Sequence, residues 1–181
     1  MPAQHVFAGW TASLGAPIAT FAVLLALAAP ARPEDARIDR LDLVESGFYE
    51  TAAATVVGSV ASPGAAAGKT VNLGDVHLVP EPPATGARVG TGFGVRFRSL
   101  GEPAGARAVL RSVWHIPEPG IRNPNNGNTY RESVADFTAI VGEPHMRGYQ
   151  FDAPWEVVPG TWTIEIRQGD RKLLEQSFTI R

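Results

Sequence analysis

Phe93-Gly-Val-Arg-Phe-Arg-Ser99 places an apolar side chain at every second position. A period of two is typical of a β-strand that packs one face on a core and leaves the other in solvent. The segment therefore predicts a half-buried strand in which Phe93, Val95 and Phe97 face inward. The rest of the chain can be judged by whether it repeats this pattern.

Two segments near the C-terminus repeat it. Residues 161–167 and 174–180 alternate in the same way and are separated by Gln168-Gly-Asp-Arg171, which is rich in turn-forming residues. Two alternating runs with a short polar turn between them predict an antiparallel hairpin. Trp162 and Phe178 fall on the apolar faces, so we expect them in one core on neighbouring strands.

The register of this hairpin follows from its apolar faces. A simple two-residue loop at Gly169 and Asp170 pairs Ile166 with Leu173 and sets apolar residues opposite polar ones. Pairing Ile166 with Leu174 keeps the faces matched. This pairing needs either a three-residue loop or a two-residue turn followed by a bulge near Leu173.

Five weaker segments are also rich in strand-forming residues: Ile38–Tyr49, Thr70–Val79, Ala108–Ile116, Ser133–Val141 and Arg147–Phe151. Seven to eight strands with turn signals between them predict an all-β fold, an antiparallel β-sandwich.

Two stretches do not have a strand pattern. Thr51–Gly68 is rich in Ala and Gly and predicts a flexible loop or a poorly packed strand. Pro117–Tyr130 contains several Asn, Pro and Gly and predicts a long exposed loop.

The first 31 residues have the pattern of an export signal. They contain no Lys, Arg, Asp or Glu, and the apolar run 18–29 leads into Ala29-Pro-Ala31, a small-x-small site. We expect a signal peptide at 1–31, cleaved after Ala31, and a single domain at 32–181 that is periplasmic or secreted. The alternative is an uncleaved anchor, which would give the protein its only contact with a membrane.

Composition excludes several classes of function. Lys and Arg total 16 and Asp and Glu total 18, so the net charge of −2 lacks the positive surface of a nucleic-acid-binding protein. The absence of Cys excludes disulfides, thiol nucleophiles and zinc–cysteine sites. Outside the signal segment the histidines are His77, His115 and His145, and no pair has zinc-site spacing. We therefore expect no metal site and no cofactor.

Several motifs together resemble a known family. They are Ala87-Arg-Val-Gly-Thr-Gly-Phe-Gly-Val-Arg-Phe97, Asn123-Pro124, the block 148–162 with its Phe-Asp-Ala-Pro-Trp-Glu and Pro-Gly-Thr-Trp sequences, and Gly169-Asp-Arg-Lys-Leu173. The chain resembles an uncharacterised family, a domain of unknown function, of small and often exported bacterial domains. The resemblance implies an immunoglobulin-like sandwich. It carries no activity, ligand or catalytic residue.

Asp152-Ala-Pro-Trp-Glu156 is the strongest candidate site in the sequence. Asp152, Trp155 and Glu156 are the candidate binding residues, because two carboxylates beside an aromatic ring suit a sugar, and no residue is assigned a catalytic role. The structural alternative is a rigid turn in which Trp155 packs and Glu156 bonds a backbone amide. We favour a non-catalytic binding or interaction module with a protein or glycan partner in the cell envelope. The alternative is a small hydrolase of glycan-type substrates that uses Asp152 and Glu156.

Overall fold

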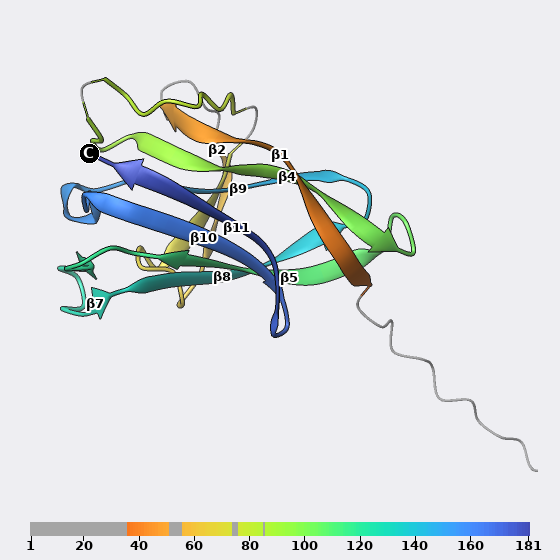
Figure 1. Cartoon of the computed structure of the whole chain (residues 1–181). Helices are drawn as coiled ribbons and strands as arrows, with labels where there is room; N and C mark the ends of the chain where they lie inside the picture. Colours follow the sequence, from red (N-terminus) through yellow and green to blue (C-terminus); the bar gives the residue numbers. More distant parts are fainter. Residues whose placement is uncertain (1–35, 51–55, 74–75, 85) are drawn as a thin grey trace, which may run out of the picture. The chain divides into compact units, whose positions relative to one another are not determined.

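Seven antiparallel strands form two sheets in the computed structural model, which describes residues 36–50, 56–73, 76–84 and 86–181 (Figure 1). The first sheet has the order β1-β4-β9, with β1 at Arg37–Glu50, β4 at Thr91–Glu102 and β9 at Pro144–Gln150. The second has the order β11-β10-β5-β8, with β5 at Arg107–His115, β8 at Glu132–Ile140, β10 at Gly160–Gln168 and β11 at Arg171–Ile180.

The connections between the sheets make the fold an immunoglobulin-like β-sandwich. The chain passes from one sheet to the other between β4 and β5, between β8 and β9, and again between β9 and β10. This is the Greek-key arrangement of such domains. The predicted all-β fold class is confirmed. The expected signal peptide at 1–31 lies outside the described residues.

Smaller elements complete the described chain. They are two short hairpins, β2 (Val56–Ala61) with β3 (Lys69–Leu73) and β6 (Ile121–Arg122) with β7 (Thr129–Tyr130), and the 3-10 helix η2 (Pro154–Glu156). The described part of 51–68 forms β2 and the turn that leads into β3, and it buries Ala65 and Ala66. Of the two alternatives predicted for this stretch, the poorly packed strand is the one that its described part adopts, since the described side chains of β2 are largely exposed and Val60 is 58% exposed.

Two other sequence predictions need correction. Thr70–Val79 is not one strand, because β3 ends at Leu73 and Val79 instead forms a bridge with Phe48 of β1. The segment divides because its first part pairs with β2, whereas Val76 and Leu78 pack elsewhere, in a small cluster with a tyrosine of β1. The 117–130 loop is not exposed throughout. Ile121 enters the core and the Asn123 side chain is buried and hydrogen-bonded.

The C-terminal hairpin has the register that its apolar faces require. Ile166 lies opposite Leu174, and a two-residue turn at Gly169 and Asp170 is followed by a bulge at Leu173. The second of the two predicted solutions is therefore the one adopted. Trp162 pairs directly with Phe178, and both side chains are buried in the main core, as predicted.

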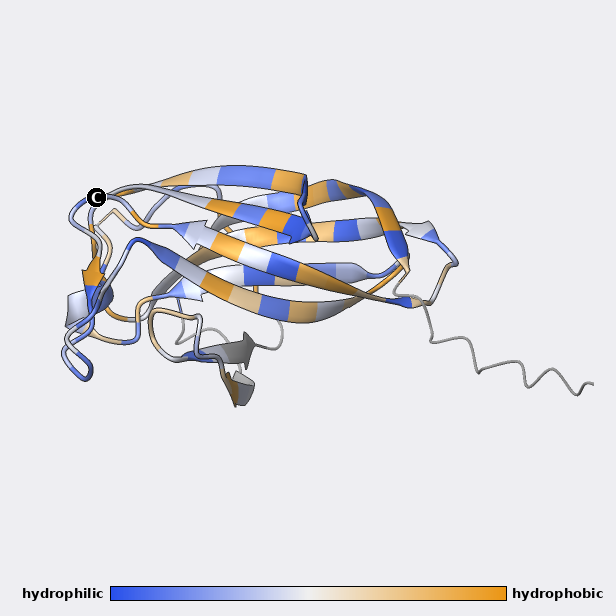
Figure 2. Cartoon of the chain, turned by 90° about the horizontal axis from the view of Figure 1, so that it is seen from below, coloured by the Kyte–Doolittle hydropathy of each residue, from blue (hydrophilic) through white to orange (hydrophobic). Residues whose placement is uncertain are grey.

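Alternation along the strands builds the core between the sheets. Figure 2 shows hydrophobic and hydrophilic residues alternating along the ribbons. In β4 the inward residues Phe93, Val95 and Phe97 are fully buried, which confirms the first prediction. Trp162 is also fully buried, and its indole N–H donates to the Val158 carbonyl at 2.8 Å, so its polar atom is satisfied.

Trp162→Ala should lower the free energy of unfolding by about 3–5 kcal/mol, because it leaves a cavity in a close-packed core. Urea unfolding of the purified variant measures this loss. The control is Val109→Ala on β5, whose side chain is 46% exposed and should cost about 0.5 kcal/mol or less. If Trp162→Ala lowers the free energy of unfolding as little as the control does, the inward face of β10 does not pack in the core.

Candidate functional site

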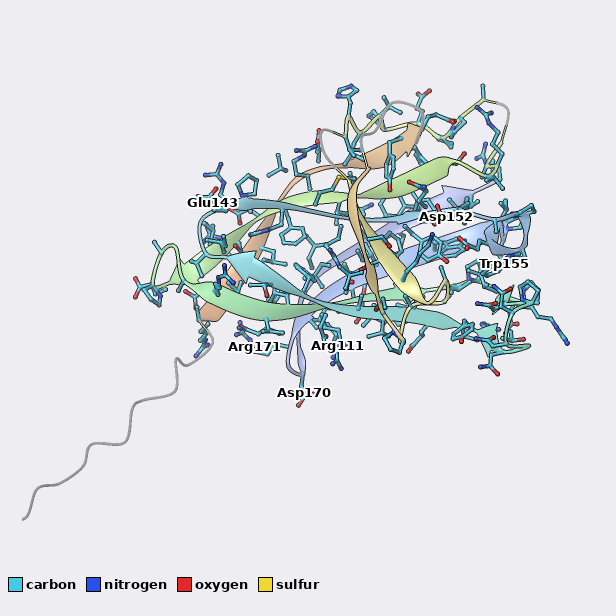
Figure 3. All side chains as sticks on the ribbon, turned by 180° about the vertical axis from the view of Figure 1, so that it is seen from behind. Arg111, Glu143, Asp152, Trp155, Asp170 and Arg171 are labelled. Atoms are coloured by element: carbon cyan, nitrogen blue, oxygen red, sulfur yellow. The ribbon has the colours of Figure 1, made fainter. Side chains whose placement is uncertain are left out.

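The sandwich is open on the side where β8 and β9 lie, because each is the last strand of its sheet. The β2–β3 hairpin crosses this opening, as its yellow ribbon shows in Figures 1 and 3. Its turn is attached to β8 by two hydrogen bonds. The Val134 N–H donates to the Gly64 carbonyl at 2.9 Å, and the Ala66 N–H donates to Ser133 Oγ at 3.0 Å.

Side chains attach the hairpin at two further points. The Asn123 amide nitrogen donates to the Ala66 carbonyl at 3.0 Å, which connects the turn to the 117–130 loop. Lys69 Nζ lies 3.3 Å from Asp152 Oδ2, an ion pair that connects β3 to the segment after β9. The hairpin therefore acts as a roof that is fixed to both sides of the opening.

A pocket of about 170 Å³ lies beneath this roof. Trp114 of β5 and Ser133 of β8 form part of one wall, Tyr149 and Gln150 of β9 form part of another, and Lys69 belongs to the roof. Trp114 and Ser133 belong to one sheet and Tyr149 and Gln150 to the other, so the pocket lies between the two sheets at the open side of the sandwich.

Two polar atoms of residues that line this pocket are buried from solvent and have no hydrogen-bond partner among the described residues. They are the hydroxyl oxygen of Tyr149 and Oε1 of Gln150. Tyr149 is only 8% exposed. Burial, reinforced by the nearby carboxylates Glu156 and Asp152, raises the pKa of Tyr149, so its hydroxyl keeps its proton and can donate. Leaving such groups unpaired costs stability.

Glycines in the first sheet make room for a second tyrosine in the pocket. The Tyr49 ring crosses Gly92 of β4, where a Cβ would lie 2.1 Å from the ring carbon Cζ. A Cβ on Gly148 of β9 would lie 3.0 Å from the Tyr49 hydroxyl. The Gly90-Thr-Gly-Phe-Gly94 sequence therefore permits a close approach between neighbouring strands and side chains.

The three candidate residues from the sequence lie in different environments. Asp152 lines the pocket, pairs with Lys69, and accepts a hydrogen bond from the Gln150 amide nitrogen at 2.7 Å. Glu156 is 1% exposed and its Oε2 accepts the Asp152 backbone N–H at 3.0 Å. Trp155 is partly buried against the main core. Figure 3 shows Asp152 and Trp155 at this end of the sandwich, and of the three only Asp152 is among the described residues that line the pocket.

Sequence reasoning missed Tyr149, Gln150 and Lys69. Tyr149 alternates with Phe151 and is a core residue by that pattern, which says nothing about whether its hydroxyl finds a partner. Lys69 lies in a hairpin that the sequence did not predict. No local motif signals such a site, because its residues meet only when the hairpin crosses the sandwich.

The histidines lie apart from the pocket. His115, on β5, contacts two carboxylates, with its ring nitrogens 3.3 Å from Glu132 and 3.5 Å from Glu165. In the described ranges of the chain, no group of three or more His, Asp or Glu is placed to hold a metal ion. No helix in the same ranges is long and apolar enough to span a membrane.

Glu156 should make stability depend on pH. Burial raises the pKa of Glu156 to about 7, and the Asp152 charge acts in the same direction, whereas the hydrogen bond from Asp152 and the Lys69 charge oppose it. The folded protein therefore binds this proton more tightly than the unfolded chain, whose Glu pKa is about 4.3. The contribution of Glu156 to stability falls as pH rises from about 4.5 to about 7 and is constant above that range.

Glu156→Gln keeps an acceptor for the Asp152 N–H but cannot ionise. The free energy of unfolding of the variant minus that of wild type should be roughly 1–3 kcal/mol larger at pH 8 than at pH 4.5. Urea unfolding at both pH values measures the gain, with Glu81→Gln as an exposed control. If the free energies of unfolding of Glu156→Gln and wild type differ by the same amount at both pH values, the raised pKa of Glu156 is contradicted.

Several solved structures are similar to this chain, among them the following two. An immunoglobulin-like protein from Pseudomonas aeruginosa is 24% identical, with a TM-score of 0.48, and the match covers 81% of this chain and 97% of that one. A β-D-glucoside glucohydrolase from Trichoderma reesei is 13% identical, with a TM-score of 0.36, and the match covers 78% of this chain and 19% of that one. The sequence has no significant match among curated proteins.

A family model described as "Domain of unknown function (DUF3859)" matches residues 81–180. The match extends from just before β4 to the last residue of β11, so it includes six of the seven strands of the two sheets and every pocket residue except those of β1 and the roof. The chain therefore belongs to the DUF3859 family.

Proposed function

We propose that this protein is an exported, non-catalytic binding module of the cell envelope and that its binding site is the pocket beneath the β2–β3 hairpin. The partner is a protein or glycan that places one small polar group in the pocket. The immunoglobulin-like fold of a family without an assigned activity fits a non-catalytic module. The uncharged N-terminal segment supports export.

The observation that carries this proposal is the pocket itself, which the β2–β3 hairpin covers and which residues of both sheets line. In its lining Lys69 pairs with Asp152, and Ser133 accepts a roof N–H. The walls of the pocket combine apolar surface, from Trp114 and Met146 among others, with nearly as much polar surface, and ligand sites use such a mixture to bind and orient a partner. The β2–β3 hairpin covers the pocket, but its side chains do not fill it.

A hydrolase at Asp152 and Glu156 has weaker support. Two-carboxylate hydrolysis needs both groups beside the scissile bond. Glu156 is buried away from the described lining of the pocket and is hydrogen-bonded to the backbone of Asp152. A substrate in the pocket would therefore meet Asp152 alone, and Asp152 is held by Lys69 and Gln150.

NMR titration with a collection of small polar fragments tests the site. The amide signals of Ser133, Gly148 and Gln150 should move when a fragment binds. Ala67→Phe, which fills the pocket from the roof, should weaken binding about ten-fold or more, whereas Ala84→Phe on an exposed loop should not. Binding that maps elsewhere, or that survives Ala67→Phe, would overturn the site.

Asp152→Asn separates the module from the hydrolase. It should lower the melting temperature by a few degrees, because it weakens the ion pair that holds the roof, and it should abolish no activity. Wild type and variant are incubated with glycan and ester panels while melts are recorded in parallel. Turnover by the wild type that is lost in a fully stable Asp152→Asn variant would overturn the non-catalytic assignment.

A further inference from the structure

Arg147 of β9 brings a positive charge to the pocket that no described residue balances. It lines the pocket and makes neither a hydrogen bond nor an ion pair with the described part of the chain. Its guanidinium carbon lies 4.2 Å from the centroid of the Phe137 ring of β8, a cation–π contact that leaves the N–H donors of the guanidinium without an oxygen acceptor. Lys69 differs, because it pairs with Asp152. The described lining therefore carries one positive charge in excess.

The position of Arg147 makes this charge costly to leave alone. The side chain is partly buried, and burial lowers the pKa of Arg147, although a guanidinium stays protonated at neutral pH. A charge that is removed from water is stabilised when an opposite charge bonds to it. The lining therefore favours a ligand that brings one negative charge.

The free edge of β9 adds a backbone donor beside Arg147. β9 is the last strand of its sheet and pairs along one edge only, with β4. The Phe151 N–H donates to the Thr91 carbonyl, and every second residue of an antiparallel strand bonds its neighbour in this way. Arg147 thus directs its backbone groups to β4, and Gly148 directs its N–H to the free edge. Gly148 lines the pocket, and the described part of the hairpin makes no backbone hydrogen bond to β9.

These donors suit a carboxylate. The two oxygens of a carboxylate accept two parallel N–H bonds from one guanidinium, which a single planar group matches well. Phosphate is less suitable, since it brings close to two negative charges at neutral pH. Asp152 also lines the pocket, and its carboxylate would repel the second of these charges.

The remaining walls indicate what carries the carboxylate. Thr70 and Ser133 contribute hydroxyl groups, and Trp114 contributes an apolar surface. A hydroxyl both donates and accepts, so these side chains suit a ligand with hydroxyl groups beside its acid. The acidic side chain of a protein has only methylene groups there. The volume of about 170 Å³ is below the roughly 300–1,000 Å³ of sites for drug-sized ligands and favours one ring.

Building on the proposed binding site, we infer that the pocket takes the carboxylate of a uronic acid, the acidic sugar residue at the end of a glycan. Arg147 binds the carboxylate, and the Gly148 N–H donates to the same group. The hydroxyls of the sugar ring bond to Thr70 and Ser133, and its C–H face lies against Trp114. The charge that Arg147 brings is then balanced within the pocket.

Calorimetric titration with matched probes tests this inference. The probes are the methyl glycosides of galacturonate and glucuronate, and the methyl esters of both, which remove only the negative charge. N-acetylglutamate amide represents a protein carboxylate, and inorganic phosphate represents a second anion. At least one uronate should bind, and the esters, the glutamate probe and phosphate should bind about ten-fold more weakly or not at all. In wild type the Gly148 amide proton should move downfield with the uronate and not with its ester.

Substitutions at Arg147 identify the cation. Arg147→Met keeps an unbranched apolar side chain and removes the charge, so it should weaken uronate binding ten-fold or more. Arg147→Lys keeps the charge but loses the two-pronged geometry, and its affinity should fall between those of wild type and Arg147→Met. Arg98→Met is the matched control, because Arg98 is exposed on β4 and does not line the pocket, and it should leave binding unchanged. Thermal melts of all three variants verify that each is folded.

The outcomes separate the ligand class from the site. Uronate binding that Arg147→Met retains, or that the methyl ester equals, would overturn the carboxylate assignment. Preference for the glutamate probe or for phosphate would overturn the uronic acid assignment. Polar fragments that bind and are blocked by Ala67→Phe, with no uronate bound, would overturn this inference and leave the pocket as a binding site. A pocket that binds neither fragments nor uronates would overturn both proposals.

Discussion

The Phe93 ring is the contact on which the rest of the sandwich depends. It comes from β4, the central strand of the first sheet, and its centroid lies 5.2–5.5 Å from the rings of Trp114, Trp162 and Phe178 in the second. Aromatic rings at such distances, many of them edge to face, hold a fixed geometry. The separation of the two sheets is therefore set at this point, and the pocket wall at Tyr149, which stacks on the same ring, takes its position from it.

The sequence predicts those parts of the fold that rest on local alternation. The inward face of β4 and the register of the C-terminal hairpin follow from a period of two, since a slip of one residue would expose every apolar side chain. The same reasoning requires Ile166 to pair with Leu174 and leaves two ways to do so, a three-residue loop or a bulge near Leu173, of which the structure has the bulge. Where alternation is weak, as in Thr70–Val79, the prediction of a single strand is wrong because separate neighbours pair with its two parts.

The candidate site was much less predictable. Asp152 stands out as a carboxylate beside aromatic residues, and the structure places it in the pocket wall. Lys69 and Ala67 reach the same pocket only because the β2–β3 turn bonds to β8, a contact between residues about 67 positions apart. The missing partner of the Tyr149 hydroxyl is a property of the whole neighbourhood, and no pattern of residue types along the chain encodes it.

The roof is an insertion between two strands that already pair with each other. β1 and β4 are hydrogen-bonded neighbours along almost their full length, so the residues between them add nothing to the order of the sheets. The family match begins at residue 81, after the β2–β3 hairpin. β1 also lies before residue 81, so the match leaves out this strand as well as the roof. A change in the length of the hairpin would leave the pairing of β1 with β4 intact and would alter only the part of the pocket wall that the roof supplies.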